Sequence, residues 1–252
     1  MRVLAAAALV AALAALAPRP IAAAPKAPAA AGPCRRGMVS IAGRFCVDPF
    51  EESTEEAVSR GKWRAHSPFV PVTGLDVRAV SRKGVFPQAY LSRDDADAAC
   101  TRAGKRLCSD DEWRSACKGS RDAKFPWGDE RHDGYCADTH RVAPLPVVFP
   151  GVAAPLLYDF DRMNDPRLNQ VKGSLAPTGT YPRCRGDARV WDMVGNLHEW
   201  TAATTGTFRG GYYLDTTLNG DGCDYATVAH DRGYHDYSIG FRCCADVRAV
   251  KR

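Results

Sequence analysis

Two amphipathic helices are the clearest elements that the spacing of apolar and polar residues predicts. The first covers residues 96–103 and follows a capping box at residues 92–95, in which a serine and an aspartate sit three positions apart. The second covers residues 113–118 and follows a similar capping box at residues 109–112. A glycine comes directly after each run, where a helix ordinarily ends. The chain is therefore expected to have two main helices.

The rest of the chain predicts short strands and long irregular segments. Residues 37–48 alternate loosely and are expected to form short strands, whereas residues 53–87 are expected to be mostly loop. Residues 142–157 carry several prolines and are expected to form an irregular insertion. Further short strands are expected at residues 178–182, 188–192, 199–202, 207–213 and 240–243. This pattern predicts an irregular α+β domain.

The N-terminus has the layout of a secretory signal peptide. Met1 and Arg2 give a short positive start, an apolar run follows over residues 3–17, and small residues crowd positions 21–24. The apolar run is shorter than the roughly 20 residues that a membrane-spanning helix needs. We therefore expect a signal peptide over residues 1–24, no membrane span, and a secreted or periplasmic protein.

The remainder is expected to be one domain on a short tether. Residues 25–33 are almost entirely alanine and proline, a composition that cannot bury a core. Residues 34–252 are long enough for a single domain and contain no second low-complexity linker. We expect a monomer whose partner, a protein or a small molecule, is not identified by the sequence.

Charge excludes one class of partner. The chain has 34 Lys and Arg against 29 Asp and Glu, a formal net charge of +5, and the two signs are interspersed. Nucleic-acid binding usually requires a basic stripe or basic residues interleaved with aromatic ones, and neither is visible. We therefore expect a mixed-charge, solvated surface and no nucleic acid.

Ten cysteines make disulfides the expected crosslinks. An even number of cysteines in an exported chain favours a disulfide framework. A metal site is disfavoured, because no CxxC or HxxxH spacing occurs. Counting alone leaves the connectivity open. The cysteines are Cys34, Cys46, Cys100, Cys108, Cys117, Cys136, Cys184, Cys223, Cys243 and Cys244.

Five short sequence blocks then point to a family. They are AGKRLCSDDEW at 103–113, FPWGD at 125–129, WDMVGNLHEWT at 191–201, FRGG at 208–211 and GFRC at 240–243. In this order they resemble the formylglycine-generating enzyme family, also called the sulfatase-modifying factor family, in a secreted, bacterial-type member. The resemblance covers nearly the whole mature chain, residues 34–252. It implies a variant of the C-type-lectin-like fold with little regular structure.

Several residues in these blocks have a structural interpretation of their own. Gly210 and Gly211 are expected to allow a close backbone approach or a positive φ. Arg209 and Arg242 are expected to pair with carboxylates inside the fold. Four tryptophans are expected to supply core area that a fold poor in helices and strands must bury: Trp113, Trp127, Trp191 and Trp200.

The resemblance implies a structural calcium at the GN-x-x-E segment. Asn196 and Glu199 would give side-chain oxygens, and Gly195 and Leu197 would give backbone carbonyls, which are the hard donors that calcium accepts. The alternative is that Asn196 is a turn residue and Glu199 is a surface or salt-bridged acid. His198 stands where the family usually has a second tryptophan.

The resemblance also locates the family's catalytic centre, and this chain departs from it there. Family enzymes oxidise a cysteine of a client sulfatase to formylglycine, using Cu(I) held between two cysteines shortly after the RGG segment, since soft thiolates suit Cu(I). Counted without gaps, those two positions are Asp215 and Gly220. Neither side chain supplies a thiolate, so copper is not expected, no catalytic residue is assigned, and whether the chain is an enzyme stays open.

Disulfide partners follow partly from the resemblance. It implies Cys100 with Cys243 and Cys117 with Cys223. The other six cysteines pair by inference from their neighbours in the sequence. These inferred pairs are Cys34 with Cys46, Cys136 with Cys184, and Cys108 with Cys244.

Two hypotheses for function remain. The first is a non-catalytic, calcium-stabilised binding or structural module, and its candidate ligand surface comprises Asp215, Asn219, Asp221, Tyr225, His230 and His235. These side chains are alternatively ordinary polar loop residues without a ligand. The second hypothesis is an oxidoreductase that modifies a cysteine in a sulfatase-type client or uses non-haem iron. The iron would be held by His230 and His235 with Asp231 and Asp236 nearby.

Overall fold

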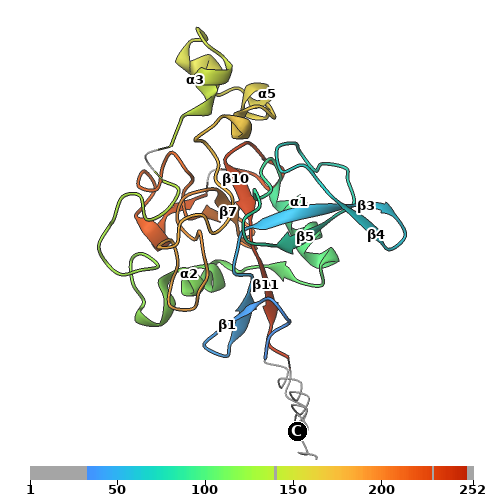
Figure 1. Ribbon diagram of the computed structural model, residues 1–252, viewed down its shortest axis with the longest axis vertical. Coiled ribbons are helices and arrows are strands. Elements are labelled where there is room, and N and C mark those ends of the chain that lie inside the picture. Colours follow the sequence, from blue (N-terminus) through green and yellow to red (C-terminus); the bar gives the residue numbers. More distant parts are fainter. Residues whose placement is uncertain (1–32, 139–140, 229, 249–252) are drawn as a thin grey trace, which may run out of the picture. The chain divides into compact units, whose positions relative to one another are not determined.

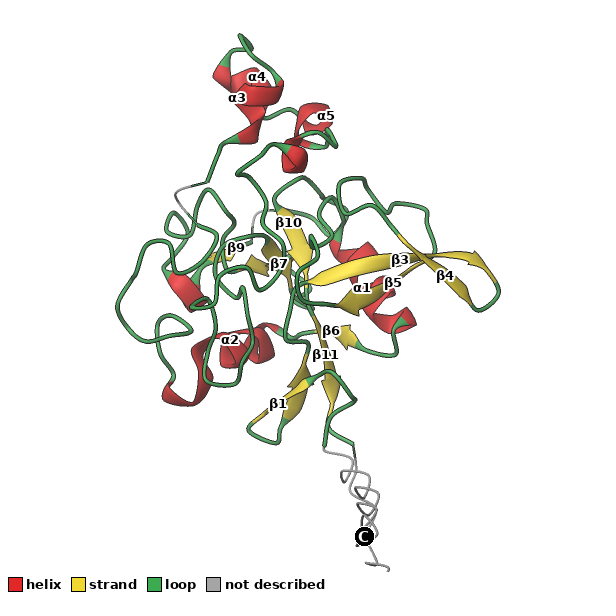
Figure 2. Cartoon of the chain, viewed as in Figure 1, coloured by secondary structure: helices red, strands yellow, loops and turns green. Residues whose placement is uncertain are grey.

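The computed structural model describes residues 33–138, 141–228 and 230–248, which form one unit of the chain. The expected signal peptide (1–24) and Ala/Pro tether (25–33) lie outside the described residues, apart from Pro33. Within the described part, no helix is long and apolar enough to cross a membrane. Strands are short and helices few (Figure 2), as expected for an irregular α+β domain.

The first sheet joins the two ends of the described chain. Its order is β1-β2-β11-β6, all antiparallel, so blue and red strands meet in Figure 1. The strands are β1 (Val39–Ile41), β2 (Phe45–Val47), β11 (Cys243–Asp246) and β6 (Arg106–Leu107). The short strands expected in residues 37–48 are therefore present.

The second sheet gathers the family-like blocks from three parts of the chain. Its order is β10-β7-β8-β9, and β10 runs parallel to β7 while the other pairs are antiparallel. The strands are β10 (Ile239–Phe241), β7 (His198–Trp200), β8 (Phe208–Arg209) and β9 (Ala226–Thr227). The HEW, RGG and GFRC motifs thus lie next to one another although they are far apart in sequence.

The third sheet corrects the expectation of loop over residues 53–87. β3 (Glu52–Ser59) pairs with both β4 (Lys62–Ala65) and β5 (Val77–Ser81) in the order β4-β3-β5. Three glutamates in β3 hid the strand, because acidic residues are depleted in strands. Cross-strand ion pairs offset their charge: both Arg78 and Arg82 contact the Glu55 carboxylate, at 2.7 and 2.5 Å.

The two expected helices are α1 (Arg93–Arg102) and α2 (Asp110–Lys118). Both capping boxes form: the serine hydroxyl accepts from the N3 backbone amide, and the N3 acid accepts from the serine backbone amide. α1 begins three residues before the apolar run because the cap is part of the first turn. α1 packs on β5, which places its buried alanines in the core.

The insertion and the connecting segments contain only short helices. Figure 1 shows the insertion in yellow-green and yellow at the top of the view. Its helices are α3 (Pro144–Val148), α4 (Ala154–Leu157) and α5 (Phe160–Met163), and single 3₁₀ turns occur at η1 (Gly119–Arg121), η2 (Leu168–Gln170) and η3 (Gly222–Asp224). The strands expected at 178–182 and 188–192 do not form. Arg189 and Asp192 both have φ of +59°, which breaks an extended run.

Five disulfides crosslink the domain. They are Cys34–Cys46, Cys100–Cys243, Cys108–Cys244, Cys117–Cys223 and Cys136–Cys184. These are the five pairs expected from the sequence, and they use all ten cysteines. No thiol is left free in the described part of the chain, which contains every cysteine.

Candidate functional site

A buried ion pair occupies the centre of the second sheet. Arg242 follows β10 and is fully buried, and its Nη2 and Nε lie 2.6 and 2.9 Å from carboxylate oxygens of Glu199 on β7. Trp113 on α2 donates its indole N–H to the same carboxylate at 2.7 Å. Glu199 is therefore a salt-bridged acid, and Arg242 has the structural pairing that the sequence predicts.

Asn196 makes a buried turn beside this pair. Its φ is +59°, a left-handed conformation that asparagine tolerates better than most residues. Its Nδ2 donates to Oε2 of Glu51 at 2.6 Å, and its Oδ1 accepts from the backbone N–H of Ala176 at 3.0 Å. The Leu197 N–H donates to the other oxygen of Glu51 at 3.1 Å. Glu51 and Asn196 thus fix the turn between them.

The two glycines after Arg209 allow the chain to pass close to this turn. Gly210 and Gly211 have φ of +87° and +70°. A Cβ on Gly211 would lie 2.4 Å from the backbone oxygen of Asp215, so only glycine fits there. The Gly210 carbonyl accepts from the N–H of Gly195 at 2.9 Å, which holds the RGG segment against the GN turn.

A sequence model of the sulfatase-modifying factor enzyme 1-like domain matches residues 50–247, most of the described domain. The chain belongs to the sulfatase-modifying factor family. Its mixture of few helices and short strands is the α+β fold expected for that family. The family-like sequence blocks supply the ion pair and the close turn described above, through Glu199, Arg242, Gly210 and Gly211.

Relatives of this chain include a protein that is named an inactive enzyme and one that is named an enzyme. A cattle (Bos taurus) protein named inactive C-alpha-formylglycine-generating enzyme 2 is 28% identical over 200 residues, covering 75% of this chain and 57% of its own. Mouse (Mus musculus) formylglycine-generating enzyme is 32% identical over 223 residues, covering 76% of this chain and 53% of its own. The chain therefore spans a little over half the length of these relatives.

Similar solved structures include PvdO from Pseudomonas aeruginosa. It aligns over 83% of each chain with a TM-score of 0.46 and 15% identity. The major tropism determinant I1 variant aligns over 87% of this chain and 55% of its own, with a TM-score of 0.48 and 13% identity.

Asp215 and Gly220, the two residues that the resemblance implies at the copper-binding positions, are turn residues in this structure. Asp215 caps a turn: its Oδ1 accepts from the N–H groups of Thr217 and Leu218, each at 2.9 Å. Its Oδ2 accepts from the Tyr225 hydroxyl at 2.8 Å. Gly220 is exposed and has φ of +114°. Thus neither position supplies a sulfur atom.

The two side chains expected to bind calcium already use their oxygens within the protein. The Glu199 carboxylate is surrounded by the Arg242 guanidinium and the Trp113 N–H, and the Asn196 oxygen caps Ala176. A Cβ on Gly195 would lie 2.2 Å from the Ala137 oxygen, so backbone fills the adjacent space. Calcium at this segment stays a prediction.

Three buried carboxylates share one guanidinium at this turn. Glu51, Asp192 and Glu199 are all buried near Arg242. Burial raises the pKa of Asp192 to about 7 and raises that of Glu51 well above its usual value, with further repulsion between the carboxylates. Burial therefore favours the neutral forms of Glu51 and Asp192 beside the Arg242–Glu199 pair.

The candidate ligand surface divides into separate groups. Asn219 joins Asp215 and Tyr225, since its Nδ2 lies 3.4 Å from the Tyr225 hydroxyl. Asp221 turns away to pair with Lys124 at 2.6 Å. His230 lines a hollow of about 450 Å³ with Thr204, Thr205, Gly206, Asp231, Arg232 and Gly233. Nδ1 of His235 lies 2.7 Å from the side-chain oxygen of Asn164.

The histidines expected to hold iron are not brought together with their acids. His230 stacks on Tyr234 at 3.9 Å between ring centroids, whereas His235 contacts Phe160. Asp231 caps the backbone at Gly233, and Asp236 accepts from Ser238 and Tyr234. In residues 33–138, 141–228 and 230–248, no metal-like cluster forms from this set.

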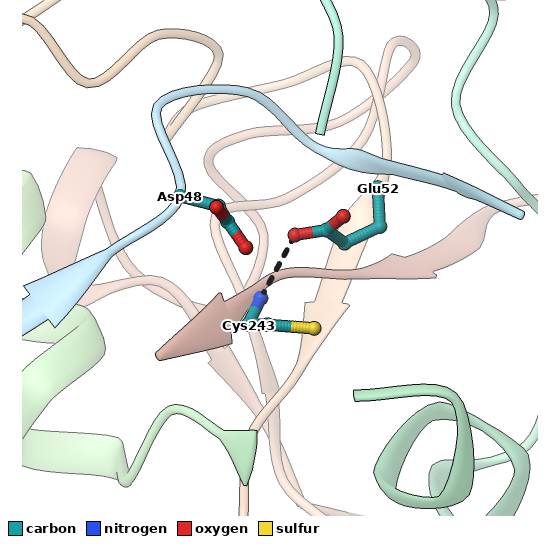
Figure 3. A group of neighbouring side chains, drawn as sticks. All are labelled: Asp48, Glu52 and Cys243. Atoms are coloured by element: carbon teal, nitrogen blue, oxygen red, sulfur yellow. Dashed lines mark hydrogen bonds between the residues drawn. The ribbon is translucent and has the colours of Figure 1, made fainter. Parts of the chain in front are cut away.

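One cluster that the sequence did not indicate is Asp48, Glu52 and Cys243, whose candidate donor atoms lie within 4.8 Å (Figure 3). It does not suit a metal, because the Cys243 sulfur is bonded to Cys100. Lys105 contacts Asp48 and lies 3.8 Å from Glu52, so an ammonium already supplies the positive charge. Burial raises the pKa of Glu52 well above its usual value. The cluster is a neutralised, buried acid pair.

His198, which stands where the family usually has a second tryptophan, packs its imidazole ring against aromatic side chains. Its ring centroid lies 4.7 Å from that of Phe208 and 4.9 Å from that of Tyr212. Within the described residues, Nδ1 of His198 is buried without a hydrogen-bond partner. Burial therefore lowers the pKa of His198 to about 3.

Replacing His198 by phenylalanine is expected to stabilise the protein, and more at about pH 5 than at about pH 8. Below about pH 6.5, His198 is protonated in the unfolded chain but stays neutral in the folded protein. The free energy of unfolding therefore falls by about 1.4 kcal/mol for each pH unit of acidification. The variant should escape this loss and gain about 2 kcal/mol more at the lower pH. Urea unfolding at both pH values measures it, and an equal gain at each would contradict the burial of a neutral imidazole.

Proposed function

We propose that this chain is a non-catalytic member of the sulfatase-modifying factor family that acts as an exported, disulfide-stapled binding module. One observation carries the proposal: every cysteine is in a disulfide. The family resemblance agrees with it, because a count without gaps from the RGG segment puts Asp215 and Gly220 at the copper-binding positions. The family's oxidation of a client cysteine needs two free thiolates near each other to hold Cu(I). This chain has no such pair to offer.

Two further observations support the proposal. The relatives from cattle and mouse that are named inactive formylglycine-generating enzymes are 28% and 26% identical to the chain, so loss of catalysis in this family has precedent in those names. Five disulfides in a domain of this size favour an oxidising compartment outside the cytosol. Export through the expected signal peptide follows from the same reasoning.

The module would bind through the polar loop after the RGG segment. Asp215, Asn219 and Tyr225 form one hydrogen-bonded group on it, and His230 lines a separate hollow. Loops on a crosslinked framework commonly carry binding residues, because the framework holds them without ordering cost on binding.

A peptide assay tests the proposal. The purified protein, loaded with copper under air, is incubated with a Cys-x-Pro-x-Arg peptide, and the peptide is followed by mass spectrometry. We expect an unmodified peptide, with a catalytically active formylglycine-generating enzyme as the positive control. Conversion of the cysteine to formylglycine would overturn the proposal.

Calcium is tested separately by thermal unfolding in calcium and in EDTA. A ligand that binds only the folded state raises the melting temperature as its concentration rises. Because Asn196 and Glu199 already use their oxygens within the protein, we expect the same melting temperature in both buffers. A clear rise in calcium would restore the calcium-stabilised form of the hypothesis.

A further inference from the structure

Two adjoining hollows lie where the beginning and end of the described chain meet. One, of about 430 Å³, lies between residues 104–106 and residues 245–248. The other, of about 380 Å³, lies between residues 35–38 and β5. Arg35 and Lys105 line both hollows, so the two are parts of one surface, here called the Arg35 surface.

The Arg35 surface is basic. Its acidic lining residues are Asp48 and Asp246. Its basic lining residues are Arg35, Arg36, Arg78, Arg102, Lys105, Arg106 and Arg248. The sequence did not reveal this concentration of charge, because the seven residues come from four separate segments of the chain.

Three of these arginines are available to a ligand. Arg78, Arg102, Lys105 and Arg106 are neutralised by acids of the same domain. Arg35, Arg36 and Arg248 are exposed and form no ion pair within the described part of the chain. Unpaired guanidinium groups keep their donors for a carboxylate, which they bind in a two-pronged geometry.

The backbone holds these three arginines near one another. The guanidinium of Arg35 donates to the Ala103 carbonyl at 3.4 Å and lies over Gly104, where a Cβ would come within 2.6 Å of Nη1. The N–H of Arg248 donates to the carbonyl of Pro33 at 2.7 Å, which ties the end of the described chain to its beginning. Hydrogen bonds thus hold together the chain segments that carry Arg35, Arg36 and Arg248.

The residues that line the two hollows favour a peptide over a nucleic acid or a membrane. Among the described residues, no aromatic side chain and no exposed large apolar one lines either hollow, so stacking on bases and insertion into a bilayer have no support. β5 is the edge strand of its sheet, and four successive residues of β5, 78–81, line the second hollow. Because side chains alternate along a strand, that hollow runs along the strand's edge, where an extended peptide can add.

We propose that the Arg35 surface binds an acidic, extended segment of a partner protein. Carboxylates of the segment pair with Arg35, Arg36 and Arg248, and its backbone follows the edge of β5. This proposal goes beyond the binding loop described above and does not depend on it, because it concerns other residues and holds whether or not the family's catalysis is lost.

Charge reversal on the whole chain tests the proposal. The probe is a fluorescently labelled peptide of alternating glutamate and serine, followed by fluorescence anisotropy. We expect R35E/R36E to weaken binding by at least about tenfold, because two attractive pairs become repulsive. Added salt should weaken binding by the parent, since the pairs are exposed to solvent.

A matched control carries the same change in charge elsewhere. R60E/K62E alters two exposed basic residues at the turn between β3 and β4, and it should bind the peptide within about twofold of the parent. Unchanged thermal unfolding shows that R35E/R36E folds. Three outcomes would overturn the proposal: no binding by the parent, equal loss in the control, or tighter binding of an oligonucleotide or of anionic phospholipid vesicles than of the peptide.

Discussion

Replacing Arg242 by methionine is expected to lower the free energy of unfolding by about 3–5 kcal/mol, the usual cost of removing one partner of a buried ion pair. Arg242 is fully buried and donates to Glu199, to the Asp48 carbonyl at 2.9 Å and to the Trp191 carbonyl at 2.8 Å. Without the guanidinium, the buried Glu199 carboxylate loses its counter-charge beside two further buried acids, Glu51 and Asp192. Denaturant unfolding with the disulfides intact measures the loss.

Two companion variants show whether the charge itself is responsible. R232M removes one partner of an exposed pair with Asp94 and should cost less than about 1 kcal/mol. The double variant E199Q/R242M should lose less than the sum of the two single changes, because the unpaired carboxylate is gone. If R242M costs no more than R232M, the network around Arg242 does not stabilise the fold as described.

Removing the Cys117–Cys223 disulfide with C117A/C223A is expected to cost about 4–5 kcal/mol. The bond closes a sequence separation of 106 residues, and long loops gain the most from a crosslink because it restricts the unfolded chain. Both cysteines are fully buried, so alanine at each site also loses packing. Guanidinium unfolding without reductant measures the change.

The Cys34–Cys46 disulfide is the matched control. It closes a separation of only 12 residues, so C34A/C46A should cost about 3 kcal/mol or less. A greater loss in C34A/C46A than in C117A/C223A would mean that loop closure does not govern the stabilisation. The comparison matters for function, since Cys117–Cys223 anchors the loop that follows the RGG segment to α2.

Local signals made part of this fold predictable. Ser92 and Ser109 marked the starts of α1 and α2, because a capping box acts within a few residues. The disulfide pairs followed from the family resemblance and from neighbouring cysteines. Arg242 was expected to pair with a carboxylate, and Glu199 accepts it.

Other features of the structure depend on contacts between residues far apart in the sequence, which short sequence patterns do not show. β3 looked like a loop because its sequence is polar, and Arg78 and Arg82, the partners that neutralise Glu55, come later in the chain. The oxygens of Asn196 and Glu199 likewise have partners from elsewhere in the chain, the Ala176 N–H and the Arg242 guanidinium. The Arg35 surface is assembled from separate segments, so no window of sequence shows it.

All ten cysteines are locked in disulfides, so no thiol pair remains for the family's chemistry. Intact-mass spectrometry after alkylation with iodoacetamide, in native buffer and again in denaturant without reductant, tests it most directly. We expect no alkylated cysteine in either condition and ten after reduction. Two alkylated cysteines without reductant would contradict the five disulfides and would favour an oxidase function for the chain.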